Sequence, residues 1–167
     1  ALGLRTHLVI ASSGNKSLLH LALSPRYPVR KKLIEDIARL PRRHRVDGIQ
    51  LDLEGPHSEE RAELVSFIGD LKRALPAGCR LSLALPAKRS DDDSAWIYAD
   101  LPGLADRFVI MAYDLHWKGG PPGAVSDVPW LGEVLAYTGA KLPRDAVVVG
   151  LPFYGRVWQR EEVAKAL

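Results

Sequence analysis

The chain has 167 residues, of which 47% are hydrophobic and 26% charged, so it suits a single domain with a buried core and is neither disordered nor fibrous. Its formal net charge of +3 is small, and its basic residues form no stripe interleaved with aromatic side chains, which argues against a nucleic-acid partner. No stretch reaches the roughly 18 apolar residues that a membrane span needs, and no signal peptide is visible.

The first half of the chain alternates between short apolar runs, which are typical of strands, and apolar residues at helical spacing. We expect strands at residues 6–11 and 46–53. Between them, the apolar spacing predicts a helix that Pro28 opens and Pro41 closes. A second helix is expected to start at Ser58 and to continue as one apolar stripe as far as Leu75.

The second half repeats this alternation. Strands are expected at residues 80–85, 107–113 and 146–151, and helices at 96–101, around 130–135 and from 161 onward. A loop rich in Gly and Pro, residues 119–123, separates the strand at 107–113 from the helix that follows it. Five strands that alternate with helices predict a parallel sheet that is covered on both faces.

Two α/β architectures fit this order of elements: an open doubly wound sheet, or part of an eight-stranded (β/α)8 TIM barrel. The first strand is not followed by a phosphate-binding glycine loop, which weakens the first architecture. Polar side chains crowd the carboxyl ends of several strands, where a barrel places its active site. These pairs are Ser12 and Ser13, Asp52 and Glu54, Tyr113 and Asp114, and Tyr154 and Arg156. We therefore expect residues 1–167 to form a single, partial barrel domain of about five β/α units.

The most informative stretch is residues 47–54. Side chains alternate across a strand, so Gln50, Asp52 and Glu54 are expected on one face. Two carboxyls so close together in a partly desolvated place disfavour each other's ionisation, and at least one is expected to hold a proton near neutral pH. A protonated carboxyl can donate to the oxygen of a glycosidic bond. An acidic pair that caps a loop or binds an ion is the alternative.

Residues 47–54 resemble the signature of family 18 glycoside hydrolases, Asp-x-x-Asp-x-Asp-x-Glu on the fourth barrel strand. Three further motifs occur in the order of that family: Ser12-Ser13-Gly14, Met111-Ala112-Tyr113-Asp114, and Gly150 to Arg156. The resemblance implies that the chain supplies the third to seventh strands of the barrel. The loop at 120–123 and the Trp130 that follows it are most similar to the bacterial branch that lyses spores and cell walls.

The resemblance also implies a retaining, substrate-assisted hydrolysis of β-linked N-acetylglucosamine polymers, either chitin or peptidoglycan. Glu54 would protonate the glycosidic oxygen and later activate water, Asp52 would orient the substrate's acetamido group, and Tyr113 would donate a hydrogen bond to that group. No cofactor or metal is implied, and the expected location is extracellular or in the cell envelope. The residues placed around the substrate are Gln50, Met111, Asp114, Trp117, Tyr154 and Arg156, with packing as the alternative role for Met111, Trp117, Tyr154 and Arg156.

The sequence departs from the family pattern in two ways. Gln50 stands where the pattern has Asp, and an amide can hydrogen-bond but cannot share a proton with Asp52. We expect a working site with a shifted pH optimum, and the alternative is a sugar-binding module that has lost turnover. The second departure is that five strands leave a barrel incomplete, so we expect marginal stability or association with another chain that covers the open sheet edges.

Overall fold

Five strands form one parallel sheet whose spatial order follows the chain, β1-β2-β3-β4-β5, in the computed structural model of residues 3–12 and 14–158. The strands are β1 (His7–Ala11), β2 (Gly48–Asp52), β3 (Arg80–Pro86), β4 (Arg107–Met111) and β5 (Val147–Gly150). The α-helices are α1 (Lys16–Leu23), α2 (Pro28–His44), α3 (Arg61–Ala74) and α4 (Val128–Lys141). Short 3-10 turns lie at η1 (Ser58–Glu60), η2 (Tyr98–Asp100) and η3 (Arg144–Ala146).

All five predicted strands are confirmed, with ends that differ by at most two residues, and the helices need three corrections. The helix expected at 96–101 is only the 3-10 turn η2. Helix α1 was not predicted, because its apolar residues span only two turns. Helix α2 does not close at Pro41 but continues to His44. Pro41 lies in the last turn, and its carbonyl oxygen accepts hydrogen bonds from the backbone N–H groups of Arg45 and Val46. Ser13 and the expected helix from residue 161 lie outside the described residues.

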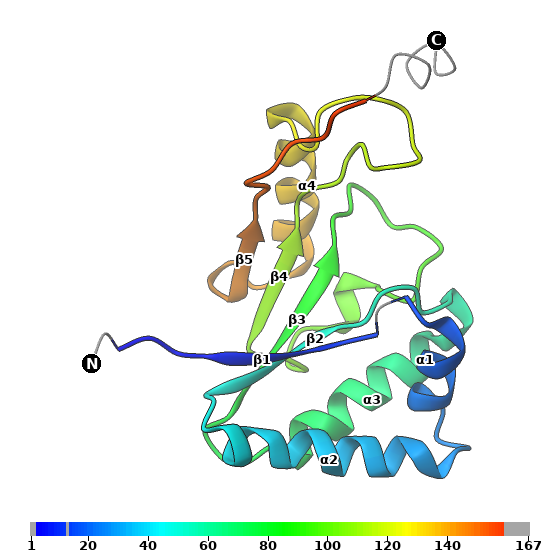
Figure 1. Ribbon diagram of the computed structural model, residues 1–167, viewed down its shortest axis with the longest axis vertical. Coiled ribbons are helices and arrows are strands. Elements are labelled where there is room, and N and C mark those ends of the chain that lie inside the picture. The colour runs from blue at the N-terminus through cyan, green and yellow to red at the C-terminus, as the bar shows by residue number, and fades with distance from the viewer. Residues whose placement is uncertain (1–2, 13, 159–167) are drawn as a thin grey trace.

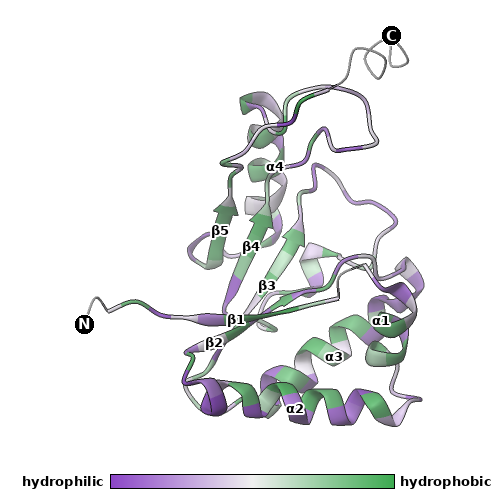
Figure 2. Cartoon of the chain, viewed as in Figure 1, coloured by the Kyte–Doolittle hydropathy of each residue, from purple (hydrophilic) through white to green (hydrophobic). Residues whose placement is uncertain are grey.

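The two faces of the sheet differ in burial, most of all at the edge strands β1 and β5. On the face that helices cover, the alternate strand residues are fully buried; among them are Ile49, Leu51, Leu83 and Ile110. Figure 1 shows α1, α2 and α3 beside β1 to β3, and α4 beside β4 and β5. Figure 2 shows hydrophobic residues along β3 to β5 and alternating hydrophobic and hydrophilic bands on α2, as expected where one helix face packs on the sheet.

The opposite, inner face is open at both edges of the sheet, so the expected cover on both faces is incomplete among the described residues. The strand register aligns Val9 with Gln50 and aligns Val109 with Val148, and both edge valines are about half exposed, 50% for Val9 and 46% for Val148. A strand order that never reverses, with the helices along one face, excludes the doubly wound alternative, whose order reverses at a switch point. The expected architecture, part of a β/α barrel, is therefore confirmed. No helix within the described ranges is both long enough and apolar enough to cross a membrane.

Gly48 is the first residue of β2 and lies between His7 of β1 and Arg80 of β3. A Cβ atom added there would stand 2.6 Å from the backbone oxygen of Arg80 and 2.5 Å from Nε2 of His7. We expect Gly48→Ala to lower the free energy of unfolding by about 2 kcal/mol, because the neighbouring strand cannot move aside. Gly132→Ala on α4 is the control, since nothing lies within 4 Å of its added Cβ. Urea unfolding of the two variants measures the difference, and equal stability would contradict this view of the packing.

Candidate active site at the carboxyl ends of the strands

Asp52 is the last residue of β2, on the inner face of the sheet. Its side chain is half-buried, and its Oδ1 atom is buried without a hydrogen-bond partner among residues 3–12 and 14–158. A buried carboxylate oxygen without a partner is costly and rare in folded proteins. Such an atom can receive its partner from a bound ligand or from water.

Glu54 follows two residues after Asp52, beyond the end of the strand. Its side chain is exposed, so the expected desolvation of this carboxyl is not seen in this chain. The physical reason is that, within residues 3–12 and 14–158, the five-stranded sheet leaves this side chain uncovered. Its backbone, in contrast, is held from β1: Ser12 Oγ accepts from the Glu54 N–H at 2.9 Å and donates to the Glu54 carbonyl at 3.1 Å.

Tyr113 follows β4 and lies close enough to Asp52 and Glu54 for their negative charges to act on its phenol. Burial is the largest cause that raises the pKa of its phenol, followed by the negative charges of Asp52, Asp114 and Glu54. The phenol therefore remains a proton donor at neutral pH. Side chains from two different strand ends, β2 and β4, are thus brought to one region of the inner face.

Asp114 accepts hydrogen bonds from two residues that follow β5. Its Oδ1 accepts hydrogen bonds from the Tyr154 hydroxyl at 2.8 Å and from the Arg156 guanidinium at 2.6 Å. The Arg156 bond is the largest cause that lowers the pKa of Asp114, so this carboxyl is ionised at neutral pH. Asp114 also has a positive φ of 58°, which turns the chain sharply after Tyr113. The Tyr113 and Tyr154 rings pack edge to face, with 6.4 Å between their centroids. Tyr154 therefore contacts both Asp114 and Tyr113.

Gln50 lies one step below Asp52 on the same face and joins a row of polar side chains. Ser82 Oγ lies 3.5 Å from Gln50 Oε1 and 3.0 Å from His7 Nδ1. The amide therefore has a hydrogen-bond partner on β3, which in turn contacts His7 on β1, and its position is compatible with support of Asp52 from beneath.

The remaining predicted substrate contacts are placed less centrally. Met111 is half-buried on the inner face, at the end of β4. Trp117 is 55% exposed in the loop after β4. One side of its indole rests on the Gly119-Gly120 turn, where an added Cβ would come within 3.2 Å of the ring at either glycine. A broad aromatic face therefore remains open to solvent, as stacking on a sugar requires.

Two residues near the site have no motif that singles them out. Trp96, in the loop after β3, donates from Nε1 to the carbonyl of Leu53 at 3.2 Å. Lys88 is only 3% exposed, and its ammonium group binds the carbonyl of Trp96 at 2.8 Å. The only signal in the sequence is an isolated lysine in a loop beside three aspartates.

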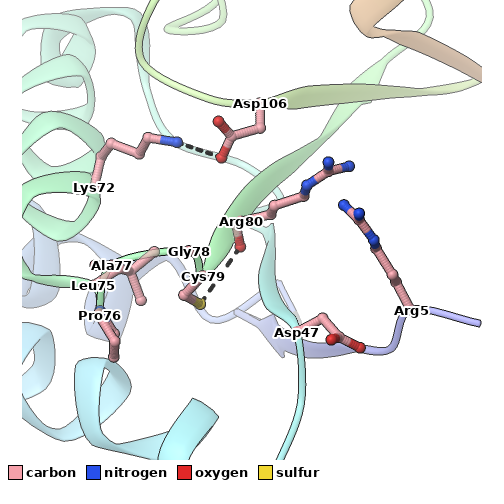
Figure 3. A pocket seen from close by; sticks show the side chains of 10 residues that line it. All are labelled: Arg5, Asp47, Lys72, Leu75, Pro76, Ala77, Gly78, Cys79, Arg80 and Asp106. Carbon is pink, nitrogen blue, oxygen red and sulfur yellow. Dashed lines mark hydrogen bonds and ion pairs between the residues drawn. The ribbon is translucent and has the colours of Figure 1, made fainter.

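A separate cavity of about 710 Å³ opens at the amino ends of β2 to β4, the end opposite to Asp52 and Glu54. Figure 3 shows its charged lining: Lys72 pairs with Asp106, and the guanidinium groups of Arg5 and Arg80 point toward each other. In enzymes with a β/α barrel, the active site lies at the carboxyl ends of the strands. This cavity at the amino ends is therefore not the candidate active site. Within the described part of the chain, no group of three His, Cys, Asp or Glu residues is arranged to hold a metal ion.

Fold and site together define part of a β/α barrel with an acidic, tyrosine-containing site at the carboxyl ends of its strands. Residues 3–166 match the model of the glycosyl hydrolases family 18. The chain belongs to this family.

The chain is similar to several bacterial members. It is 31% identical over 135 residues to the uncharacterized glycosylase YvbX of Bacillus subtilis, covering 77% of this chain and 39% of that protein. It is 30% identical to a cortical fragment-lytic enzyme of Bacillus anthracis, covering 78% and 32% respectively. The crystal structure of the Bacillus cereus spore cortex-lytic enzyme SleL superimposes with a TM-score of 0.81 at 28% identity, covering 97% of this chain and 43% of that chain. The chain thus spans less than half the length of these relatives.

Proposed function

We propose that this chain carries the catalytic residues of a hydrolase that cleaves β-linked N-acetylglucosamine polymers, of the chitin or peptidoglycan type. The observation that carries the proposal is the buried Oδ1 of Asp52, which no described residue partners and which lies beside Glu54 and Tyr113. An acetamido N–H of the substrate has the chemistry to satisfy that oxygen. Membership of glycosyl hydrolases family 18 and the similarity to enzymes named for lysis of cortex fragments support the same substrate class.

In the proposed reaction, Glu54 first donates its proton to the glycosidic oxygen, and the bond from that oxygen to the anomeric carbon breaks. The substrate's own acetamido carbonyl oxygen forms the new bond to the anomeric carbon, which yields a cyclic oxazolinium ion. Asp52 orients the acetamido N–H and stabilises the positive charge, and the Tyr113 hydroxyl holds the acetamido oxygen.

The second half of the proposed reaction regenerates the enzyme. The Glu54 carboxylate takes a proton from water, whose oxygen attacks the anomeric carbon and opens the ring. The two displacements together retain the β configuration, and Glu54 ends in its protonated state. Glu54 is exposed in this chain, and in the proposed reaction the bound substrate excludes water from its carboxyl. The whole protein is proposed to act outside the cytoplasm or in the cell envelope, where such polymers occur.

A binding module without turnover is the second candidate, and Gln50 is the observation that favours it. An Asp at this position can exchange a proton with Asp52, whereas the amide can only hydrogen-bond.

Activity and binding measured side by side separate the two candidates. The full-length protein is incubated with N-acetylglucosamine oligomers and with peptidoglycan fragments from about pH 4 to about pH 8. Hydrolysis is expected, and its first product is expected to be the β anomer in proton NMR. Saturable binding without any product would establish the binding module instead, and an α anomer as first product would exclude the retaining mechanism.

A further inference from the structure

The backbone around Glu54 is held by side chains in place of strand pairing. The β2 strand ends at Asp52, so Leu53 and Glu54 lie beyond the regular ladder of the sheet. Two residues from neighbouring segments supply the missing bonds. Trp96 Nε1 donates to the Leu53 carbonyl at 3.2 Å, and Ser12 Oγ bonds both the N–H and the carbonyl of Glu54. The first bond comes from the loop after β3 and the second from the end of β1.

Trp96 is itself firmly fixed. Its side chain is 4% exposed, and its carbonyl accepts a hydrogen bond from the ammonium group of Lys88. That ammonium group also bonds Ser94 Oγ at 3.2 Å and pairs with the Asp92 carboxylate at 2.5 Å, so all three of its protons have acceptors. A buried, fully bonded lysine makes the loop after β3 a rigid support for Trp96.

Ser12 is fixed in a similar way on the other side. Its backbone N–H donates to the carbonyl of Asp52 at 3.1 Å, which extends the β1–β2 ladder by one bond. Gly55, which follows Glu54, has φ of +85° and turns the chain away immediately after the acid. The backbone of Glu54 is therefore set by bonds before, at and after this residue.

We propose that Trp96 and Ser12 are positioning residues that form a two-sided clamp on the backbone of Glu54 and so aim its carboxyl at the scissile bond. This inference rests on the proposed function of Glu54 as the acid. An exposed, flexible side chain gains accuracy from a fixed backbone, and a displacement of about 1 Å from the reacting atoms costs up to roughly a hundredfold in rate. Both residues bond the backbone of Leu53 and Glu54, so the clamp is expected to act on turnover and not on affinity.

The kinetic test uses Trp96→Phe, which removes the N–H donor but keeps an aromatic ring, and Ser12→Ala. Each is expected to lower kcat on a chitooligosaccharide roughly tenfold, with KM little changed; Trp96→Phe, which leaves a gap in the core, is also expected to lower the melting temperature. Ser12→Thr keeps the hydroxyl and is expected to restore most of the rate. Trp130→Phe, on α4, and Ser90→Ala, in the loop after β3, are the matched controls and are expected to retain the wild-type kcat. Wild-type kcat in both clamp variants would overturn the proposal.

Two further measurements separate the clamp from a general structural role and from the proposed function. In the Glu54→Gln background, Ser12→Ala is expected to leave the residual rate unchanged, because the clamp acts through Glu54; an undiminished tenfold loss would contradict that. Hydrogen exchange of the Glu54 amide needs no activity at all. Exchange is expected to be slow in the wild-type protein and at least tenfold faster in Ser12→Ala, and equal rates would overturn the clamp even in an inactive protein.

Discussion

Glu54→Gln is expected to abolish hydrolysis of a chitooligosaccharide, with a loss in kcat of roughly a thousandfold or more. The amide has nearly the shape of the carboxyl but has no acidic proton to give to the glycosidic oxygen. Binding of the oligosaccharide is expected to stay within about twofold, because Asp52, Tyr113 and the aromatic contacts are unchanged. Product release by chromatography and a binding titration on the same sample measure the two effects.

The control for this variant is Glu59→Gln, five residues further on. Glu59 is an exposed glutamate of the η1 turn, so the same change in charge is made without touching Asp52 or Tyr113. Its activity is expected to equal that of the wild-type protein. If Glu54→Gln and the Glu59→Gln control had the same kcat, Glu54 would not be the proton donor.

Tyr113→Phe is expected to lower kcat roughly a hundredfold, because the hydroxyl is the donor that meets the acetamido oxygen as charge develops there. The pKa of Tyr113 is raised, mainly by burial and then by the charges of Asp52, Asp114 and Glu54. A raised pKa keeps the phenol protonated to a higher pH than usual. The loss is therefore expected to be constant from about pH 4 to about pH 8, since the donor does not titrate in that range.

The control for the second variant is Tyr27→Phe, which removes an exposed hydroxyl at the start of α2. It is expected to leave kcat and KM unchanged. If Tyr113→Phe raised KM and left kcat unchanged, Tyr113 would only bind the ground state of the substrate, and its proposed role in the transition state would be wrong.

The order of strands and helices could be predicted from the sequence because each strand carries a local signal. Runs such as Val147 to Val149 are apolar at successive positions, as strands covered on both faces are. Helix α1 escaped prediction because Leu18, Leu19, Leu21 and Leu23 span too few residues to separate a helical period from a strand. Its one clear signal was Asn15, whose side chain accepts a hydrogen bond from the N–H of Leu18 as an N-cap.

Part of the candidate site could also be predicted. Parallel strands bring their carboxyl ends to one edge, so the proximity of Asp52 and Tyr113 follows from their places at strand ends. The exposure of Glu54 could not be predicted, because strand alternation gives the face on which a side chain lies but not what covers that face. The roles of these residues in catalysis stay predictions until the variants are measured.

By itself, the sequence determined the number and order of the strands, the choice of a barrel-like sheet, and the acidic and aromatic groups at its carboxyl edge. All of these follow from the spacing of apolar residues and from short motifs, and both are set by residues close together in the sequence. Only the tertiary structure decided that Trp96 and Ser12 meet the backbone at Leu53 and Glu54, across separations of 43 and 42 residues. The physical reason is that a hydrogen bond between distant segments depends on strand register and on the path of each loop. Neither the strand register nor the loop path can be read from a repeating pattern of residues in the sequence.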